Sequence, residues 1–437
     1  MDNVSAAFKI KELKDKLLYS LLVISSICLV TLVPVPAVNN PQLRDLLASW
    51  GDLGILMNVT SVGGFASGSV ILLGIYPFLA ASILMQILTL VVPKLRNLAQ
   101  LGDAGTKVIA KITRIATIVM CVIMGGLCAY GIRDAFIPTL NFWVAIVIAG
   151  LAISAGAAAI AWGCEILNTK GLGNGISLIL FAGCARYIPG VLVKVFTKSA
   201  EKFGIPLAVV FTVLGVILSI ALITFMVFVT MGERKVKILF RKMTSGMKQF
   251  GVPNQVIPIH ITQAGVMPVV YSLTIVSFPA VITAMLNPGS TDPMILSVTD
   301  VTHNVLYFIL FLMFMVLFVY IFSIMQFNPV DVANEIRNYG GYIQGVKAGK
   351  LTSEYLFKLY MNMIIIGAVY LTLLCAVPMG LSLIPGLGKI WFAGLSFVIL
   401  AGCITEVLMI LANGIKTHEE GEKQKNKRYK SAGRNFR

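Results

Sequence analysis

The chain has 437 residues, of which 57% are hydrophobic and only 12% are charged, and its mean hydropathy is +0.88. An average soluble domain carries about 25% charged residues, so this composition excludes a soluble globular protein and indicates a polytopic membrane protein. Most lysines and arginines behind the net charge of +16 lie between apolar segments. That placement favours membrane orientation and contact with anionic lipid or an acidic partner over DNA binding.

A helix needs about 20 apolar residues to cross a bilayer, and the sequence offers ten such segments. In chain order they are 17–36, 70–92, 108–131, 142–164, 174–196, 205–231, 264–286, 304–325, 356–380 and 388–412. The residues before the first segment mix acidic side chains with lysines and show no clear cleavage site. We therefore expect this segment to be retained and not removed as a signal peptide.

The basic residues are divided unevenly between the two sets of ends and loops that ten spans create. One set contains the N-terminal lysines, the loops around 94–114 and 170, the stretches 232–263 and 326–355 with Lys358, and the tail from 416 to 437. The other contains only Arg44, Arg133, Lys194, Lys198, Lys202 and Lys389. The positive-inside rule then predicts that both termini are cytoplasmic.

Ten spans also divide into two groups of five, and an odd number of spans reverses the orientation of the second group. This is the topology of an inverted repeat. The predicted parts are an N-terminal half, 1–200, a C-terminal half, 201–412, and a basic tail, 413–437. Both long cytoplasmic stretches belong to the second half, which makes that half the better candidate for docking a large partner.

The stretch WGDLGILMNVTSVGGFASGS at 50–69 is too short and glycine-rich to span a bilayer, yet too apolar for an ordinary soluble loop. It predicts either a flexible outer loop or a short half-inserted plug over a cavity, where irregular backbone at membrane depth is tolerated. Pro77, close to Gly74, is expected to kink or break the helix that follows.

Five stretches agree in order and spacing with one family: VPVPAVN at 33–39, GIYPFLAASILMQ at 74–86, KGLGNGISLILFAG at 170–183, AGVMPVVY at 264–271 and QFNPVDVANEIRNYGGYIQGVKAGK at 326–350. They resemble the SecY protein translocases, and the chain is identified as a member of that family. The resemblance implies an all-α membrane protein, with ten transmembrane helices in two inverted five-helix halves. These halves form a clamshell around an hourglass pore, with a re-entrant plug at about 53–69.

The resemblance also assigns two sets of residues to the pore. The narrow apolar ring falls on Leu79, Ile83, Leu180, Cys184, Val270 and Ile399, and Cys184 replaces the isoleucine usual in the family. Without the family, each of these would be read as an ordinary core residue. The plug contains Leu53, Val62, Gly63, Gly64, Phe65 and Gly68.

A third set lies in the basic stretch GERKVKILFRKMTSGMK at 232–248 and in 326–350. Alternation in RKVKILF predicts a short strand, and a solvated positive loop is the alternative reading of the charge. The resemblance implies a platform for the ribosome or the SecA motor, formed by Arg234, Lys235, Lys237, Arg241, Lys242, Arg337, Lys347 and Lys350. Lys347 stands where many members carry arginine, and lysine lacks the bidentate fork.

The function implied is a protein-conducting channel that passes unfolded, signal-bearing polypeptides across the bacterial cytoplasmic membrane and releases apolar segments sideways into lipid. Its implied partners are SecE, SecG, SecA or a ribosome, with the preprotein and its signal peptide as substrate. No cofactor is expected, and the sequence has no HExxH, no GxSxG and no phosphate loop, because GLGNG at 171–175 is better explained as a turn with a helix entry. An enzyme is therefore not predicted.

A secondary transporter is the remaining alternative, but it needs ionisable groups at mid-membrane. Arg186 and Glu406 are the candidates, and both lie towards span ends, where we expect them to snorkel to the surface. All seven cysteines fall in apolar stretches without metal-like spacing and are predicted to be small core residues.

Overall fold

The computed structural model is almost entirely helical and describes most of the chain. The described residues are 10–48, 50–99, 103–138, 141–240, 243–245, 248–250, 255–261, 265–287, 305–338, 340–347, 349–382, 396–412 and 414–415. They divide into two compact units. The first contains residues 1–215, 277–301 and 403–437, and the second contains 216–276 and 302–402.

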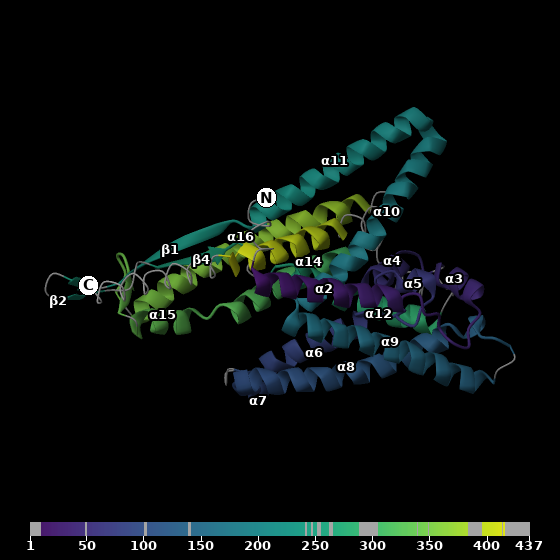
Figure 1. Cartoon of the computed structure of the whole chain (residues 1–437), viewed down its shortest axis with the longest axis horizontal. Coiled ribbons are helices and arrows are strands. Elements are labelled where there is room, and N and C mark those ends of the chain that lie inside the picture. Colours follow the sequence, from purple (N-terminus) through teal and green to yellow (C-terminus); the bar gives the residue numbers. More distant parts are fainter. Residues whose placement is uncertain are drawn as a thin grey trace, which may run out of the picture. The chain divides into compact units, whose positions relative to one another are not determined.

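The first unit is built from helices α2 to α10. Their bounds are α2 Lys11–Val30, α3 Asn40–Ala48, α4 Gly51–Thr60, α5 Gly64–Ser67, α6 Tyr76–Val91, α7 Pro93–Ala99, α8 Asp103–Gly131, α9 Phe142–Lys170 and α10 Gly175–Phe203, with a 3₁₀ turn at Arg133–Ala135. The long helices α8 and α9 pack side by side, and α6 packs on α8 (Figure 1). Helix α2 packs on α9. The beginning of α11, Ile205–Thr230, the end of α12, Met267–Leu286, and most of the helix Ser396–Ala412 also belong to this unit.

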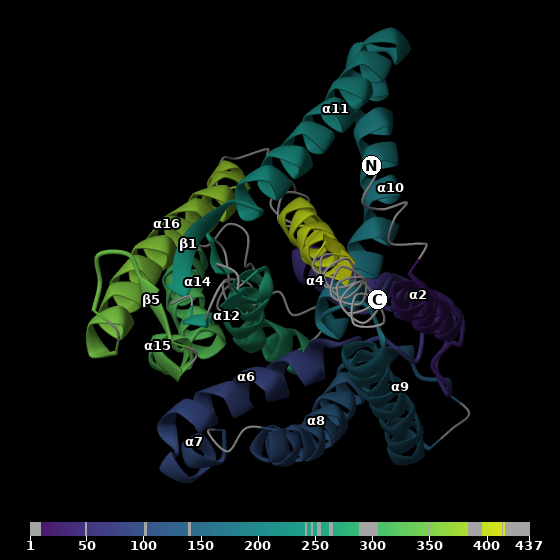
Figure 2. The ribbon, with the colours of Figure 1, turned by 60° about the vertical axis from the view of Figure 1, so that its left-hand side comes forward.

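The second unit combines helices with a small antiparallel sheet. The sheet has the order β4-β1-β5, from β1 Glu233–Phe240, β4 Gln255–His260 and β5 Gly341–Ile343, and a separate hairpin pairs β2 Met243–Ser245 with β3 Lys248–Phe250. Helices α14 Val305–Gln326 and α16 Lys350–Ser382 pack together, with α15 Pro329–Asn338 against α16 (Figure 2). Aromatic rings of Tyr271, Phe318 and Phe322 cluster between α12 and α14, with centroids 5.1–6.3 Å apart.

Within the described residues, six helices are long and apolar enough to cross a membrane, and a seventh span results if the bent pair of α6 and α7 counts as one. Each of the ten predicted segments overlaps a helix, although residues 388–395 lie outside the described part. A multi-span helical membrane protein is therefore confirmed. The total of ten spans and the inverted halves stay predictions.

The first two predicted spans have different bounds in the structure. Helix α2 ends at Val30, before the two prolines of VPVP, and residues 70–75 form turns that precede α6. The prediction that Pro77 kinks a helix is wrong, because Pro77 stands in the first turn of α6. A proline is tolerated there, since the first backbone N–H groups of a helix have no intrahelical partner. The real bend is at Val92 and Pro93, where α6 and α7 meet at 100°.

Candidate plug and pore-lining site

The segment between α3 and α6 is folded and buried. It forms α4 and α5, and the side chains of Leu53, Met57, Val62 and Phe65 are at most 3% exposed. The rings of Trp50 and Phe65 lie 5.5 Å apart and join the two short helices. The flexible-loop alternative is therefore wrong, and the plug residues predicted from the sequence form one compact element of the first unit.

The plug packs against α10 through a close backbone approach. A Cβ atom built on Gly183 would overlap the carbonyl oxygen of Val59 and lie 2.9 Å from its carbonyl carbon. Only glycine at this position lets α4 lie so near α10. A side chain as small as alanine would force the two helices apart.

The turn between α4 and α5 is held by short polar side chains. The backbone N–H of Phe65 donates to Ser61 Oγ at 2.9 Å, and that of Ala66 donates to Asn58 Oδ1 at 3.1 Å. The turn contains Val62 with φ 55° and Gly63 with φ 86°. A positive φ is ordinary for glycine, but it is strained for a β-branched residue. The turn therefore stores strain at Val62.

Arg186 is exposed, as the snorkelling prediction expects, but its guanidinium also has partners inside the first unit. Its Nη1 atom donates to the carbonyl oxygen of Val62 and to Thr31 Oγ1, each at 3.0 Å. The sequence placed Arg186 near a span end but could not show that its neighbours are plug and α2. The folded chain gives the guanidinium polar acceptors, so water is not its only partner.

Glu406 also has an internal partner. Its Oε2 atom accepts a hydrogen bond from Ser177 Oγ at 2.6 Å, and Cys403 Sγ donates to the Ser177 carbonyl oxygen at 3.0 Å. Cys403 and Glu406 are three residues apart on one helix and so share a face. They join the helix Ser396–Ala412 to the first turn of α10. The prediction that Glu406 snorkels to the surface is wrong, because this side chain is half-buried and its carboxylate is bound by Ser177 within the first unit.

The motif GLGNG behaves as predicted. Residues 171–174 form the turn between α9 and α10, and Asn174 is the N-cap of α10, accepting from the backbone N–H of Ile176 at 3.1 Å. Asn168 Oδ1 accepts from Gly175 N at 2.6 Å. The motif is a turn and helix entry, as expected.

All six residues of the predicted ring are buried in the structure, none above 5% exposure. Leu79 and Ile83 are four residues apart on α6, and Leu180 and Cys184 are four apart on α10, so each pair lies on one helix face. These four belong to the first unit, whereas Val270 and Ile399 belong to the second. The structure places each residue within its unit, and the ring they would form together stays a prediction.

The predicted strand in the basic stretch is confirmed as β1. Val236 and Ile238 are buried, while Arg234, Lys235 and Lys237 are exposed, as are Arg337, Lys347 and Lys350. Register pairs Ile238 with Ile343 of β5, which joins the two predicted docking stretches in one sheet. Lys235 pairs with Glu233 at 3.0 Å and Lys350 with Glu354 at 3.9 Å. Arg241 and Lys242 lie outside the described residues, as does the tail from 416.

Sequence reasoning missed several contributors to this site. Thr31, Asn58 and Ser61 hold the plug by hydrogen bonds, and Tyr76 at the beginning of α6 lies 3.2 Å from Ser277 Oγ of α12. The sequence carried a signal for these contacts, because polar residues at the ends of apolar stretches are expected to have hydrogen-bond partners. Their partners, however, are set by the tertiary fold.

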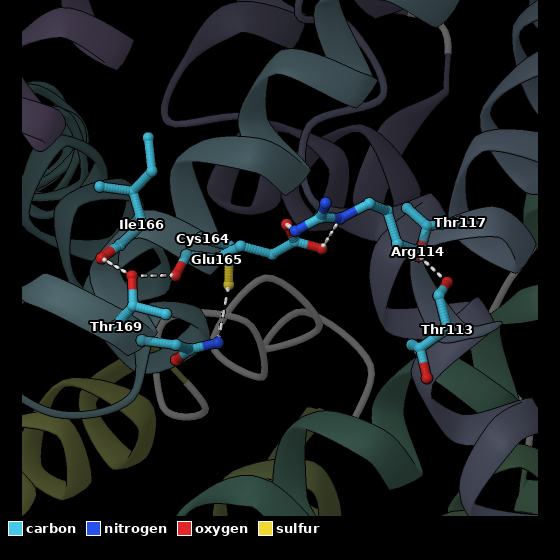
Figure 3. Close-up of polar contacts among 8 residues, drawn as sticks. Thr113, Arg114, Thr117, Cys164, Glu165, Ile166 and Thr169 are labelled. Atoms are coloured by element: carbon cyan, nitrogen blue, oxygen red, sulfur yellow. Dashed lines mark hydrogen bonds and ion pairs between the residues drawn. The ribbon is translucent and has the colours of Figure 1, made fainter. Parts of the chain in front are cut away.

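A bidentate ion pair between α8 and α9 was also missed. Arg114 Nε donates to Glu165 Oε1 at 3.0 Å and Nη2 to Oε2 (Figure 3). Figure 3 also shows Thr113, Thr117 and Thr169 making hydrogen bonds within their own helices. The pair is partly exposed and fastens α8 to α9.

The seven cysteines, all within the described ranges, are not joined in disulfides; six are buried and Cys28 is half-buried, which agrees with their prediction as small core residues. No group of three or more His, Cys, Asp or Glu side chains within the described ranges is arranged to hold a metal ion.

Comparison with known proteins defines the class to which this helical, plug-containing membrane protein belongs. The sequence profile of SecY matches residues 69–408, well over half of the chain. The protein translocase subunit SecY of Corynebacterium glutamicum is 28% identical over 448 residues, covering 96% of this chain and 99% of that one. The chain belongs to the SecY family.

Solved structures show the same fold. A SecY structure, whose description states that the plug domain stabilises the closed state of the translocation channel and maintains a membrane seal, covers 92% of both chains with a TM-score of 0.64 and 16% identity. Sec61 from a canine ribosome-channel complex covers 91% of this chain and 92% of that one, with a TM-score of 0.55 and 16% identity. The chain is thus a translocase channel subunit by family, with the fold of SecY and Sec61.

Proposed function

We propose that this chain forms the pore through which a Sec translocon passes unfolded, signal-bearing polypeptides across a bacterial cytoplasmic membrane, with sideways release of apolar segments into lipid. One observation supports this most strongly. In a member of the SecY family, the glycine-rich segment 50–69 is a buried, compact element packed on α10. A segment placed in this way can close a pore and leave it when a polypeptide enters.

The apolar ring is the second part of the proposal. Leu79, Ile83, Leu180, Cys184, Val270 and Ile399 would meet around the narrowest point when the two units are assembled. Branched aliphatic side chains dewet a narrow passage and so resist ion flow, and they can part around a polypeptide of any sequence. Cys184 is smaller than the isoleucine usual in the family, and we expect a looser seal at that position.

The exposed face of the β4-β1-β5 sheet is proposed as the docking platform for SecA or a ribosome. Lys235 and Lys237 lie on the exposed face of β1, opposite the buried Val236 and Ile238, and Arg234 is exposed near the beginning of the strand. Basic side chains on a rigid strand can meet acidic protein or the phosphates of ribosomal RNA. The resemblance to the canine Sec61, which was solved in a ribosome complex, supports the ribosome as one such partner.

The remaining partners and the orientation follow from the family and from the charge pattern. We expect SecE to clamp the two halves from outside and SecG to accompany it, with both termini of the chain in the cytoplasm because the basic loops are on that side. The exposed basic groups next to the membrane also favour contact with anionic lipid. A channel does not itself supply energy for transport, so we expect SecA or the ribosome to drive the passage.

The test is reconstitution of the full chain with its SecE partner in liposomes, with SecA, ATP and a signal-bearing preprotein. Passage is measured as protection of the preprotein from added protease. The plug is pinned by Gly64→Cys with Ile71→Cys, since a Cβ on Gly64 lies 3.4 Å from the Ile71 Cβ, close to disulfide geometry.

We expect ATP-dependent protection, its loss when the disulfide forms, and its recovery with reductant. The two single-cysteine variants are the matched controls and should translocate in oxidant and reductant alike. If the vesicles bind ribosomes but do not protect the preprotein from protease, the proposed SecA-driven transport is replaced by cotranslational transport. Vesicles that engage neither SecA nor ribosomes would overturn the proposed function.

A further inference from the structure

We infer that Arg186 is a releasable latch that holds the plug in its closed position. The inference rests on the proposed function, because a latch matters only if segment 50–69 is a moving plug. It assigns a gating role to one side chain of α10, and this side chain belongs to neither the apolar ring nor the docking platform. All residues of the latch belong to the first unit.

The contact is made by the guanidinium group at the turn between α4 and α5. Nη1 donates to the Val62 carbonyl oxygen and to Thr31 Oγ1, both at 3.0 Å. Gly63 provides the space, because a Cβ built on it would lie 2.7 Å from Arg186 Nε and 2.9 Å from Cζ. The guanidinium therefore lies directly against the plug backbone.

Thr31 makes the contact a three-way junction. It follows the last residue of α2, is 1% exposed, and donates through Oγ1 to the Cys28 carbonyl oxygen at 2.7 Å. Its own carbonyl oxygen accepts from Ser67 Oγ of α5 at 3.2 Å. Arg186 and Thr31 thus tie both ends of the segment 62–67 to the end of α2, which the packing of α2 on α9 holds in place.

The carbonyl that Arg186 holds belongs to the strained residue of the plug. Val62 has φ 55°, and Ala37 is the one other described non-glycine residue with a positive φ. Strained backbone persists where surrounding contacts over-determine it, and it is concentrated in switch regions. When the hydrogen bond breaks, Val62 can relax to a negative φ, and that rotation carries its carbonyl away from Arg186.

The contact is also built for release. Arg186 is exposed, and no ion pair within the described ranges engages it. Its acceptors are a carbonyl and a hydroxyl, both neutral, and water can replace them at modest cost. A buried ion pair at the same place would be a permanent brace, whereas this arrangement closes the plug reversibly.

The test follows exposure of the plug by cysteine labelling of the full chain in vesicles. Met57 in α4 is fully buried, so Met57→Cys reacts with a membrane-impermeant maleimide only when the plug leaves its seat. The labelling rate is compared with that of the same chain without this cysteine. Met315→Cys, on the fully buried Met315 of α14 in the second unit, reports general unfolding.

Arg186→Met keeps an apolar stem and removes both hydrogen bonds, and we expect it to raise the labelling rate of Met57→Cys about tenfold, a change of about 1.4 kcal/mol. Arg186→Lys keeps the charge without the planar fork and should give a smaller rise. Thr31→Val removes one acceptor and should also give a smaller rise. Arg114→Met, which breaks the ion pair to Glu165, is the matched control and should leave the rate unchanged.

The outcomes separate the latch from the function. If Met57→Cys is labelled slowly with Arg186 in place, and just as slowly after Arg186→Met, the latch is overturned and the plug stays intact. If Met57→Cys is labelled fast with Arg186 in place, the closed plug is overturned, and with it the proposed function. Equal acceleration at Met57→Cys and Met315→Cys shows that Arg186 stabilises the whole fold, which also overturns the latch.

Discussion

Gly183→Ala should weaken the closed plug, because α10 has no room for a methyl group where it meets α4. The added Cβ would overlap the carbonyl oxygen of Val59 and lie 3.3 Å from its Cα. These are backbone atoms, which cannot rotate aside as a side chain does, so the plug itself must shift. Overpacking of this kind costs about 1–3 kcal/mol.

Replacing glycine by alanine inside a helix also stabilises α10 by up to about 1 kcal/mol, but this gain is the same whether the plug is seated or displaced and does not offset the cost. The net weakening of the closed plug is therefore about 1–3 kcal/mol, and 1.4 kcal/mol corresponds to a tenfold change in population. Gly190→Ala is the matched control on the same helix, because nothing lies within 4 Å of its added Cβ.

The assay is ion leak through vesicles containing the full chain, together with labelling of Met57→Cys. We expect Gly183→Ala to raise both by about tenfold and Gly190→Ala to change neither. If Gly183→Ala leaks and labels like the wild-type chain, the close approach of α4 to α10 does not hold the plug, and this reasoning is wrong.

Three further predictions concern other parts of the molecule. Ser177→Ala removes the donor to Glu406 and should lower the free energy of unfolding in denaturant by about 1–3 kcal/mol, whereas Ser26→Ala, on the exposed side of α2, should have little effect. Tyr360→Phe removes the donor to the Ser323 carbonyl oxygen in a buried site and should cost about 0.5–1.5 kcal/mol in the same assay; an unchanged midpoint would show that water or another donor replaces it. Lys235→Glu with Lys237→Glu should reduce ribosome or SecA binding, and the salt dependence of that binding, without unfolding the sheet. Val236→Asp should unfold the sheet, because Val236 is buried. If the double variant binds as well as the unchanged chain, β1 is excluded as the platform.

The sequence by itself predicted the class, most spans and the strand β1. These rest on local patterns, since a run of about 20 apolar residues or an alternation of period two is visible without knowing what lies opposite. The five motifs, read together, identified the family and predicted where the plug and the pore ring lie. The bounds of α2 and α6 were less accurate, because the prolines at 34, 36 and 77 mark the ends of helices and the sequence reading placed them inside spans.

Only the tertiary structure decided what the polar side chains within the apolar segments do. Arg186 bonds Thr31 across 155 positions of the chain, and Ser177 bonds Glu406 across 229. Neither partner can be read from local sequence, and so both ionisable groups were expected to reach the surface. The fold also decided why Gly183 must be glycine, because the backbone of α4 lies against α10, a contact between segments more than 100 residues apart. The positive φ of Val62 is likewise a property of the folded turn that no local pattern predicts.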